Sequence, residues 1–349
     1  MNTRMVTLRD VAKKAGVSTW TCSVALNDLQ GVQDGIKKRV REIADKLGYV
    51  PNPGAKIMNR KKTGMFGIIL PVATPLFTAL TQGLNAQSSV LKKPIFLSYS
   101  HDDPAVEARL LKMLSSLSMD GIIIAPAPES PNAPLIEEIV SRGTPVVQLE
   151  RKLSGLSTPL IASQNQEAAA YAVKYLRGKG YDRIGLIQGK KHYSTRDEWQ
   201  GGYLAGMQQF RPDPPPEWCL SLDATQPRVA LETLKRFLMD PNMPRGLLWT
   251  IANETILSTS LKELGLENGR DLEVVLFDGD LAADLNGQVF VNLMQNGIEI
   301  GLRALQLCQE FALGQKLSFS EIRFPALRET FSGICSEPIS LDHRVESSL

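Results

Sequence analysis

Short apolar runs alternate with longer amphipathic segments along most of the chain after Met65. The first run is Phe66 to Leu70, and a helical pattern over Leu76 to Leu91 follows it. A buried strand followed by a helix, repeated many times, is typical of parallel sheets that helices cover on both faces. The pattern therefore predicts an α/β body.

The alternation continues as far as residue 313. Strands are expected over 66–70, 95–99, 121–125, 146–149, 184–188, 247–250 and 274–277, with late candidates at 324 and 331–334. Helices are expected over 76–91, 106–117, 135–142, 167–177, 202–210, 229–238, 254–264 and 299–313. These strands are too many for one comfortable sheet. We therefore expect two doubly wound parallel-sheet subdomains, with a ligand cleft outside the carboxyl ends of their strands.

The first 27 residues have a different pattern. Thr7 is placed to cap a helix, with Asp10 in the position that completes a capping box, and Gly16 ends that helix. Ser18 is placed to cap a second helix that runs to Asn27. Two helices across a tight turn form a helix-turn-helix, which presents its second helix to the DNA major groove. An ordinary helical hairpin is the alternative.

A third helix is expected over 35–47, with an apolar inner face and a basic outer face. A three-helix module of this size is near the lower limit for independent folding. Residues 53–62 then form a basic linker in which 55–59 is a candidate for a single helical turn. Because so short a helix is unstable alone, we expect it to fold only on DNA.

Charge is distributed unevenly along the chain. Residues 1–62 contain 13 Lys and Arg against 5 Asp and Glu, a net charge of +8. The remaining residues contain 26 basic and 32 acidic side chains, a net charge of −6. A basic N-terminal module on an acidic body is typical of nucleic-acid binding, because Lys and Arg near phosphates release counterions. A solvated basic face without a partner is the alternative.

Other sequence signals exclude several classes of protein. The four cysteines have no CxxC spacing and the three histidines are scattered, so neither a zinc site nor a disulfide framework is predicted. No apolar run is long enough to span a bilayer, and the N-terminus is not a signal peptide, so we expect a cytoplasmic protein. No phosphate-binding loop, GxSxG or HExxH motif is present, so we expect neither an enzyme nor a cofactor.

The N-terminal segments carry a family resemblance. The stretch VTLRDVAKKAGVSTWTCSVALN, followed by LGYVPNPGAKIM and the α/β body, resembles the LacI/GalR family of bacterial transcriptional repressors. The resemblance covers nearly the whole chain, and Asn253-Glu254, Phe277-Asp278 and Arg328 are later matches. It implies a helix-turn-helix domain, a hinge helix and a periplasmic-binding-protein-like body. The implied ranges are 1–50 for the first, 51–62 for the second and 63–349 for the body, which divides into 63–163 with 293–327 and 164–292 with 328–340.

The resemblance also implies partners. Family members act as homodimers, or as dimers of dimers, on palindromic operators, because two-fold protein symmetry requires a two-fold site. No heptad repeat for a coiled-coil tetramerisation segment is visible, so we expect a dimer rather than a tetramer. A small-molecule effector in the cleft is the second implied partner, and no membrane partner is expected.

The resemblance places base-reading side chains at the start of the second helix. Thr19 and Trp20 fall there, although Trp20 could instead be a packing residue. The third reading position is Val24, which cannot donate to guanine but could pack on a thymine methyl group. Phosphate contacts are expected from Ser18, Thr21 and Asn27. The full set of expected DNA-binding residues is Thr7, Ser18, Thr19, Trp20, Thr21, Ser23, Val24, Asn27, Tyr49, Asn52, Ala55, Lys56 and Met58.

The hinge departs slightly from the family pattern. Met58 aligns with the leucine that wedges into the minor groove at the operator centre, and Lys56 replaces the more usual Arg or Gln. Methionine is apolar and flexible, so it could unstack a base step in the same way. The alternative is that Met58 is only part of an apolar turn in the linker.

The cleft departs from the family pattern more than the DNA-binding end does. Phe77 could stack on a ring, and Glu150 and Asp278 could accept hydrogen bonds from hydroxyls. Trp199 stands where the family has Arg, and Gln164 replaces an Asp. A sugar or sugar derivative is expected, or else a larger, more aromatic or less anionic ligand. The expected effector-binding residues are Phe77, Glu150, Arg196, Trp199, Asn253 and Asp278, and each has an ordinary structural role as its alternative.

The function that fits these signals best is sequence-specific DNA binding by a transcriptional regulator, expected to be a repressor, that a small molecule controls. One alternative is a ligand-independent regulator whose cleft has drifted. A soluble small-molecule-binding protein or an enzyme with an incidental N-terminal module is the other alternative.

Overall fold

The computed structural model describes residues 6–27, 30–49, 63–211, 213–279, 287–315, 320–330 and 333–338, with residues 327–330 and 333–338 described by their backbone alone. The chain divides into two compact units, residues 1–63 and 64–349. The predicted linker helix at 55–59 and the predicted hinge contacts lie outside the described residues.

The first unit is a bundle of three helices, α1 (Leu8–Ala15), α2 (Thr19–Leu26) and α3 (Asp34–Lys46). The predicted capping box at the start of α1 is confirmed, because the Thr7 side chain accepts from the Asp10 amide and the Asp10 side chain accepts from the Thr7 amide. Gly16 ends α1 in the left-handed conformation, and Ser18 caps α2. A small apolar core joins the helices; it comprises Val11, Ala12, Ala15, Cys22, Ala25, Val40 and Ala44.

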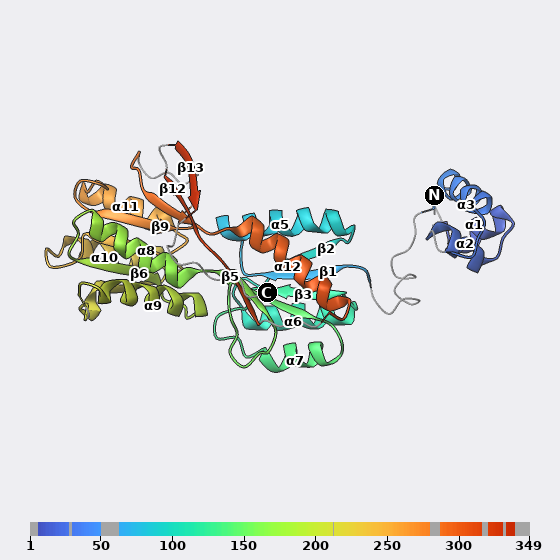
Figure 1. Cartoon of the computed structure of the whole chain (residues 1–349), viewed down its shortest axis with the longest axis horizontal. Helices are drawn as coiled ribbons and strands as arrows, with labels where there is room; N and C mark the ends of the chain where they lie inside the picture. The colour runs from blue at the N-terminus through green and yellow to red at the C-terminus, as the bar shows by residue number, and fades with distance from the viewer. Residues whose placement is uncertain are drawn as a thin grey trace. The chain divides into compact units, whose positions relative to one another are not determined.

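The second unit contains two sheets, each covered by helices (Figure 1). The first sheet has the order β11-β5-β4-β3-β1-β2, and all its pairings are parallel. We call this sheet and its helices the first subdomain. Its strands are β1 (Phe66–Leu70), β2 (Ile95–Tyr99), β3 (Gly121–Ile124), β4 (Val146–Leu149), β5 (Leu160–Ser163) and β11 (Glu321–Phe324). Its helices are α5 (Pro75–Leu91), α6 (Pro104–Ser116), α7 (Ala133–Ser141) and α12 (Gly297–Ala312).

Two separate apolar clusters fill the two faces of this sheet. α5 and α12 lie side by side over one face, and α6 and α7 cover the other (Figure 1). Glycine allows α5 and α12 to approach closely, because a Cβ atom at Gly83 would lie 2.0 Å from the Ile298 carbonyl oxygen.

The second sheet has the order β13-β12-β10-β9-β8-β6-β7 and, with its helices, forms the second subdomain. Strands β10, β9, β8, β6 and β7 pair in parallel, and β12 and β13 join the β10 edge antiparallel. The strands are β6 (Ile184–Gly189), β7 (Cys219–Leu222), β8 (Gly246–Trp249), β9 (Glu273–Phe277), β10 (Val291–Met294), β12 (Leu327–Thr330) and β13 (Gly333–Pro338). The helices are α8 (Asn165–Gly178), α9 (Ser194–Gln208), α10 (Pro227–Met239), α11 (Glu254–Leu264) and the short 3-10 helix η1 (Pro216–Trp218).

The chain crosses between the subdomains three times among the described residues, after β5, after β10 and after β11. All of β10 belongs to the second sheet, so the middle crossover follows Met294 rather than the expected residue 292. The last crossover lies between Phe324 and Leu327, two to three residues before the expected point. The broader division of the chain into domains stays a prediction.

The sequence analysis missed four strands and misplaced one helix. β5, β7, β10 and β12 have only four residues each, too few for a clear period beside their polar and proline-containing neighbours. Helix α9 begins at Ser194, whereas the expected start was about Gly202. Its first turns are polar, and Trp199 is the buried apolar residue there, so these turns carry little helical periodicity.

Candidate functional site

The start of α2 presents polar and aromatic side chains to solvent. Ser18, Thr19 and Trp20 are all exposed, and the Trp20 side chain is 66% exposed although it is large and apolar. An exposed tryptophan at the N-terminus of a second helix favours the base-reading interpretation over the packing alternative.

Val24 behaves differently from its two predicted partners on the reading face. It is only 6% exposed, so its methyl groups are covered in this conformation. The burial favours a packing role for Val24, and contact with a thymine methyl group would require that it be uncovered. Its assignment as a base reader stays a prediction.

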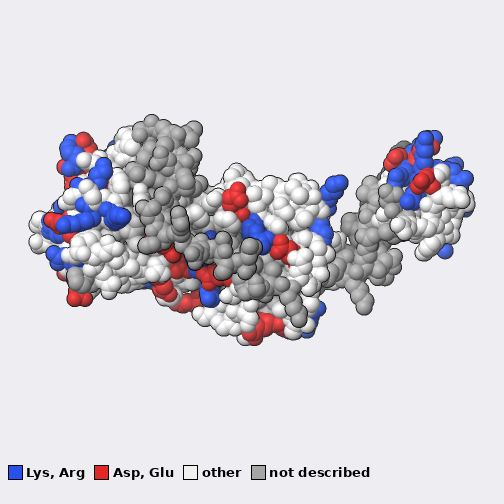
Figure 2. Space-filling model, viewed as in Figure 1, with Lys and Arg blue, Asp and Glu red and all other residues white. Residues whose placement is uncertain are grey.

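The remaining predicted DNA contacts in the described part of the unit surround α2. Thr7 is exposed, and Thr21, Ser23, Asn27 and Tyr49 are half-buried. The Asn27 amide donates to the Ser23 carbonyl at 2.8 Å, which stabilises the end of α2. Lys and Arg side chains appear on the surface of this unit (Figure 2). Asn52, Ala55, Lys56 and Met58 lie outside the described residues.

The second unit contains a cavity of about 360 Å³ between the two subdomains. Its lining residues follow the carboxyl ends of strands from both sheets. Asp102 and Glu150 follow β2 and β4 in the first subdomain, and Lys190, Thr250 and Asp278 follow β6, β8 and β9 in the second. This is the predicted position for a ligand cleft in doubly wound folds, and the volume is that of a site for a small molecule.

Three aromatic rings form an apolar part of the cavity wall. Phe77 comes from the first turn of α5, where the Thr74 side chain caps the helix. Trp199 of α9 packs against Phe277, with ring centroids 4.2 Å apart and an interplanar angle of 56°. These rings could stack on the face of a sugar or another ring.

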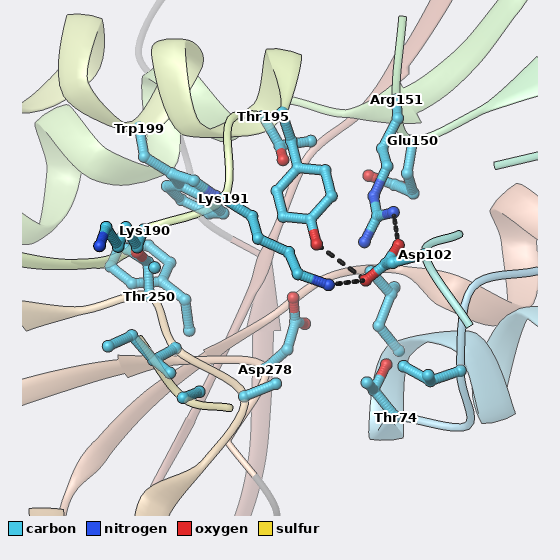
Figure 3. Close-up of a pocket in the computed structure, with 18 of the residues that line it drawn as sticks. Thr74, Asp102, Glu150, Arg151, Lys190, Lys191, Thr195, Trp199, Thr250 and Asp278 are labelled. Carbon is cyan, nitrogen blue, oxygen red and sulfur yellow. Dashed lines mark hydrogen bonds and ion pairs between the residues drawn. The ribbon is translucent and has the colours of Figure 1, made fainter. Parts of the chain in front are cut away.

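A charged bridge joins the two walls of the cavity. Arg151 Nη1 donates to Asp102 Oδ1 at 2.6 Å, and the Tyr193 hydroxyl donates to Asp102 Oδ2 at 2.8 Å. Figure 3 shows Arg151 and Lys191 both reaching Asp102. The Arg151 guanidinium also lies 3.9 Å from the centroid of the Tyr193 ring. Burial opposes ionisation of Asp102, but Arg151, Tyr193 and Lys191 together outweigh it and lower the pKa of Asp102.

Two carboxyl groups lie on the cavity floor, Glu150 buried and Asp278 half-buried. Glu150 and Asp278 both have left-handed backbone, with φ of 60° and 49°, directly after a strand of each sheet. Burial, with the charge of Asp278, raises the pKa of Glu150 to about 8. Burial also raises the pKa of Asp278 to about 7, although the Gln295 amide donates to it at 2.8 Å.

Four of the six predicted effector residues line this cavity: Phe77, Glu150, Trp199 and Asp278. Arg196 and Asn253 are not among the described residues that line it. Arg196 instead donates to the Lys190 carbonyl at 3.1 Å and to the Ser221 hydroxyl at 3.3 Å, and Asn253 lies at the N-cap position of α11. Arg196 therefore holds the segment after β6 against β7 beside the cavity.

Several cavity residues were missed by the sequence analysis. They are Asp102, Arg151, Lys190, Lys191, Tyr193, Thr195, Thr250 and Gln295. Most of them stand within a few residues of a strand's carboxyl end, so that position was a usable signal. The pairing of Asp102 with Arg151 and Tyr193 had no signal, because these residues are 49 and 91 positions apart. Within the described residues, no helix is long and apolar enough to cross a membrane.

Comparisons with known families match both units. Residues 7–52 match the family of bacterial regulatory proteins of the lacI type, and residues 63–270 match the periplasmic binding proteins and sugar binding domain of the LacI family. The second match alone covers more than half of the chain.

Individual relatives agree with these families. The chain is 29% identical to the probable HTH-type transcriptional regulator EndR of Paenibacillus polymyxa, over 57% of this chain and 59% of that protein. It is 23% identical to the HTH-type transcriptional regulator DegA of Bacillus subtilis (strain 168), over 91% of this chain and 95% of that protein. Its fold is similar to that of the lac repressor dimer bound to operator and an anti-inducer, with a TM-score of 0.80, 18% identity and coverage of 96% and 98% of the two chains.

Proposed function

We propose that this chain, which belongs to the LacI family of bacterial regulatory proteins, is a repressor. A small polar molecule would set its affinity for a palindromic operator. The observation that carries this proposal is the combination of an exposed Trp20 at the start of α2 with a cavity between two subdomains. One unit can read DNA, and the other has two walls that a ligand can hold together or apart.

At the operator, a homodimer would place two copies of α2 in successive major grooves. Trp20 and Thr19 would meet base edges, while Ser18 and Thr21 would meet phosphates. This reading face contains few charged donors, so operator discrimination would depend on apolar contacts and on DNA shape. If Val24 reads a base, exchanging Val24→Arg changes operator preference at one base pair of each half-site. An unchanged preference would leave Val24 as a packing residue only.

The cavity favours an effector with a ring and several hydrogen-bonding groups. Phe77 and Trp199 supply ring faces, Glu150 and Asp278 supply carboxyl groups, and Lys190 supplies an ammonium group. A sugar or sugar derivative has this combination. By linkage, an effector that changes operator affinity must have its own affinity changed by operator to the same extent.

Operator selection tests the DNA-binding half of the proposal. Purified full-length protein is mixed with genomic fragments, and the bound fragments are measured by gel shift and by fluorescence anisotropy at several salt concentrations. We expect a few preferred fragments that contain a palindrome, and a steep loss of affinity with salt. Equal binding to every fragment would contradict a specific operator. Deletion of residues 1–62 should abolish binding to DNA and leave ligand binding intact.

One observation favours a second candidate, a regulator that needs no ligand. Tyr193 of the second subdomain donates to Asp102 of the first, and Arg151 donates to the same carboxylate, so protein side chains alone supply a stabilising contact between the two walls. A thermal-shift screen with sugars, sugar phosphates and nucleosides separates the two candidates. Stabilisation by one class of compound supports the ligand-controlled repressor, and no shift with any compound supports the ligand-independent one.

A further inference from the structure

A series of hydrogen-bonded polar side chains, buried at its inner end and half-buried at its outer end, crosses from the cavity floor to the outer side of the hinge. Each member is within hydrogen-bond distance of the next. The series comprises Glu150, Ser163, Gln295, Asn165, Glu198 and Arg323. Ser163 ends β5 and Gln295 follows β10, so the series spans two of the crossovers between subdomains. Of these residues, Glu150 and Gln295 also line the effector cavity described above.

The direction of hydrogen bonding is fixed at the outer end. Arg323 donates from Nη2 and Nη1 to the two carboxylate oxygens of Glu198, at 2.7 and 2.9 Å. Because both oxygens of Glu198 accept from Arg323, Glu198 is an acceptor toward its other neighbour as well. Asn165 must therefore turn its NH₂ group toward Glu198, where Nδ2 lies 2.8 Å from Oε2. Its Oδ1 atom then faces Gln295 and accepts from Nε2 at 3.0 Å.

This direction passes inward to Glu150. Because Gln295 uses its NH₂ group on Asn165, its Oε1 atom faces the Ser163 hydroxyl at 2.8 Å and must accept from it. A serine hydroxyl has one hydrogen, so Ser163 has none left for Glu150. Ser163 Oγ nevertheless lies 3.0 Å from Glu150 Oε1. The hydrogen between these two oxygens must therefore come from the glutamic acid.

We propose that Glu150 is protonated at Oε1 in the free protein and that this proton sets the direction of hydrogen bonding from Glu150 to Glu198. We call this series of hydrogen bonds the relay. The proposal rests on the proposed function, since Glu150 belongs to the same effector cavity. An ionised Glu150 would draw the Ser163 hydrogen to itself. The Ser163 and Gln295 oxygens would then face each other at 2.8 Å with no hydrogen between them, across the contact that joins two crossovers.

The charges around Glu150 support a neutral carboxyl group. Asp278 faces it from the end of β9, and Glu198 of α9 adds a second negative charge. Glu254 of α11 adds to the negative field at Asp278. Arg151 is engaged with Asp102, and Arg323 with Glu198 and Glu321. Burial and the charge of Asp278 accordingly raise the pKa of Glu150 to about 8.

Through the relay, a ligand bound in the cavity can change the hydrogen bonds between the crossovers. A ligand hydroxyl or ammonium group that donates to Glu150 favours the carboxylate form. Binding of such a ligand therefore releases one proton from Glu150. The hydroxyl hydrogen of Ser163 then turns from Gln295 to Glu150. The effector class that operates this relay is a hydrogen-bond donor, such as a polyol or an amine, and not a compound that only accepts.

Infrared spectroscopy of the ligand-free, full-length protein tests the protonation of Glu150. We expect the carbonyl band of a protonated, buried carboxyl group, lost as the pH is raised with a midpoint near 8. Glu150→Gln should remove the part of this band that titrates near pH 8 and leave the part from Asp278, which titrates near pH 7. Asp278→Asn should keep the part from Glu150 and shift its midpoint to lower pH, because a negative neighbour has gone. No band of this kind attributable to Glu150 at neutral pH would overturn the proposal.

The Ser163→Ala variant tests the direction of the relay. If Ser163 accepts from protonated Glu150, its loss removes a partner of the acid and shifts the midpoint to lower pH. If Ser163 donates to an ionised Glu150, its loss shifts the midpoint to higher pH, and the relay is wrong. Circular dichroism establishes that the variant is folded.

Amide hydrogen exchange provides a second measurement that does not depend on Ser163→Ala. After correction for intrinsic rates, the wild-type segments around 163–165 and 294–297 should lose protection as the pH passes through 8. Glu150→Gln should retain protection, because its amide donates to Ser163 as the acid does. An equal loss of amide protection in the wild type and in Glu150→Gln would overturn the coupling between Glu150 protonation and these segments. Neither measurement uses DNA or effector, so failure to find an operator would leave them unaffected.

Discussion

The helix-turn-helix unit and the cleft hold their functional side chains by contacts of different range along the chain. In the first, Ser18 and Thr21 bond across three positions. In the second, Tyr193 reaches Asp102 across 91 positions, and Gln295 reaches Ser163 across 132. Local contacts form with the helix and leave the reading face exposed, whereas the distant contacts exist only when both subdomains are folded and apposed.

The two regions also differ in how far their functional side chains are buried. The helix-turn-helix places a large apolar ring in solvent, where only a partner would cover it. The cleft instead buries charged groups and satisfies most of them internally. Substitutions in the first unit should therefore change DNA binding with little effect on folding, while substitutions in the cleft should change stability first.

The largest expected effect is at the bridge across the cleft. Arg151→Met leaves the Asp102 carboxylate without its main partner, and the two side chains are only 13% and 12% exposed. We expect the free energy of unfolding of the body to fall by about 3–5 kcal/mol, measured by urea denaturation. The control is Arg142→Met, which breaks an exposed pair with Glu138 and should cost less than about 1 kcal/mol. If the free energy of unfolding falls by similar amounts in the two variants, burial does not distinguish these two ion pairs.

The next effect is on DNA binding. Trp20→Ala removes an exposed ring from the start of α2 and should weaken operator binding by about 1–3 kcal/mol per half-site. The dependence of affinity on salt should not change, because no phosphate contact is lost. Fluorescence anisotropy on the selected operator measures both quantities, and thermal melting should show an unaltered fold. A loss of stability without a loss of affinity would return Trp20 to the packing interpretation.

A pH effect distinguishes the cleft from the helical unit. The folded pKa of Asp278 is raised to about 7 from an ordinary value of 3.8, so the folded state retains a proton that the unfolded state loses. The stabilisation from this proton is complete below pH 4 and is lost as the pH rises through 7. The slope is at most about 1.4 kcal/mol per pH unit for one group.

Urea denaturation of the body between pH 4 and 9 measures this slope. Asp278→Asn should reduce it, because one of the two raised carboxyl groups no longer titrates, and Glu150 should account for what remains up to about pH 8. An unchanged slope in Asp278→Asn would show that Asp278 is ionised throughout this range.

The smallest effect concerns the cap of α2. Ser18→Ala removes the oxygen that accepts from the Thr21 amide at 3.0 Å and should cost about 1 kcal/mol in the stability of the helical unit. Ser18→Asp should restore the cap but weaken DNA binding, since it places a negative charge where a phosphate contact is expected. If Ser18→Asp binds operator as tightly as the wild type, Ser18 is only a cap.

Much of the fold could be predicted because its signals are local. Strand β4 and helix α11 have the predicted limits, since each has a clear apolar period and clear ends. The four-residue strands β5, β7, β10 and β12 were missed because their place in a sheet depends on neighbours that are distant in sequence. Val24 shows the same limit, because its position on α2 suggested a reading role and only the packed unit revealed its burial.

The sequence alone determined the class of fold and the helix-turn-helix with its caps at Thr7 and Ser18, and its resemblance to the LacI/GalR family pointed to the carboxyl groups Glu150 and Asp278. Residues three or four positions apart carry the information for helices and their caps directly. Only the tertiary structure decided how these carboxyl groups are protonated, bridged and linked to the hinge. A pKa depends on burial and on neighbouring charges, and here those neighbours come from other strands and helices.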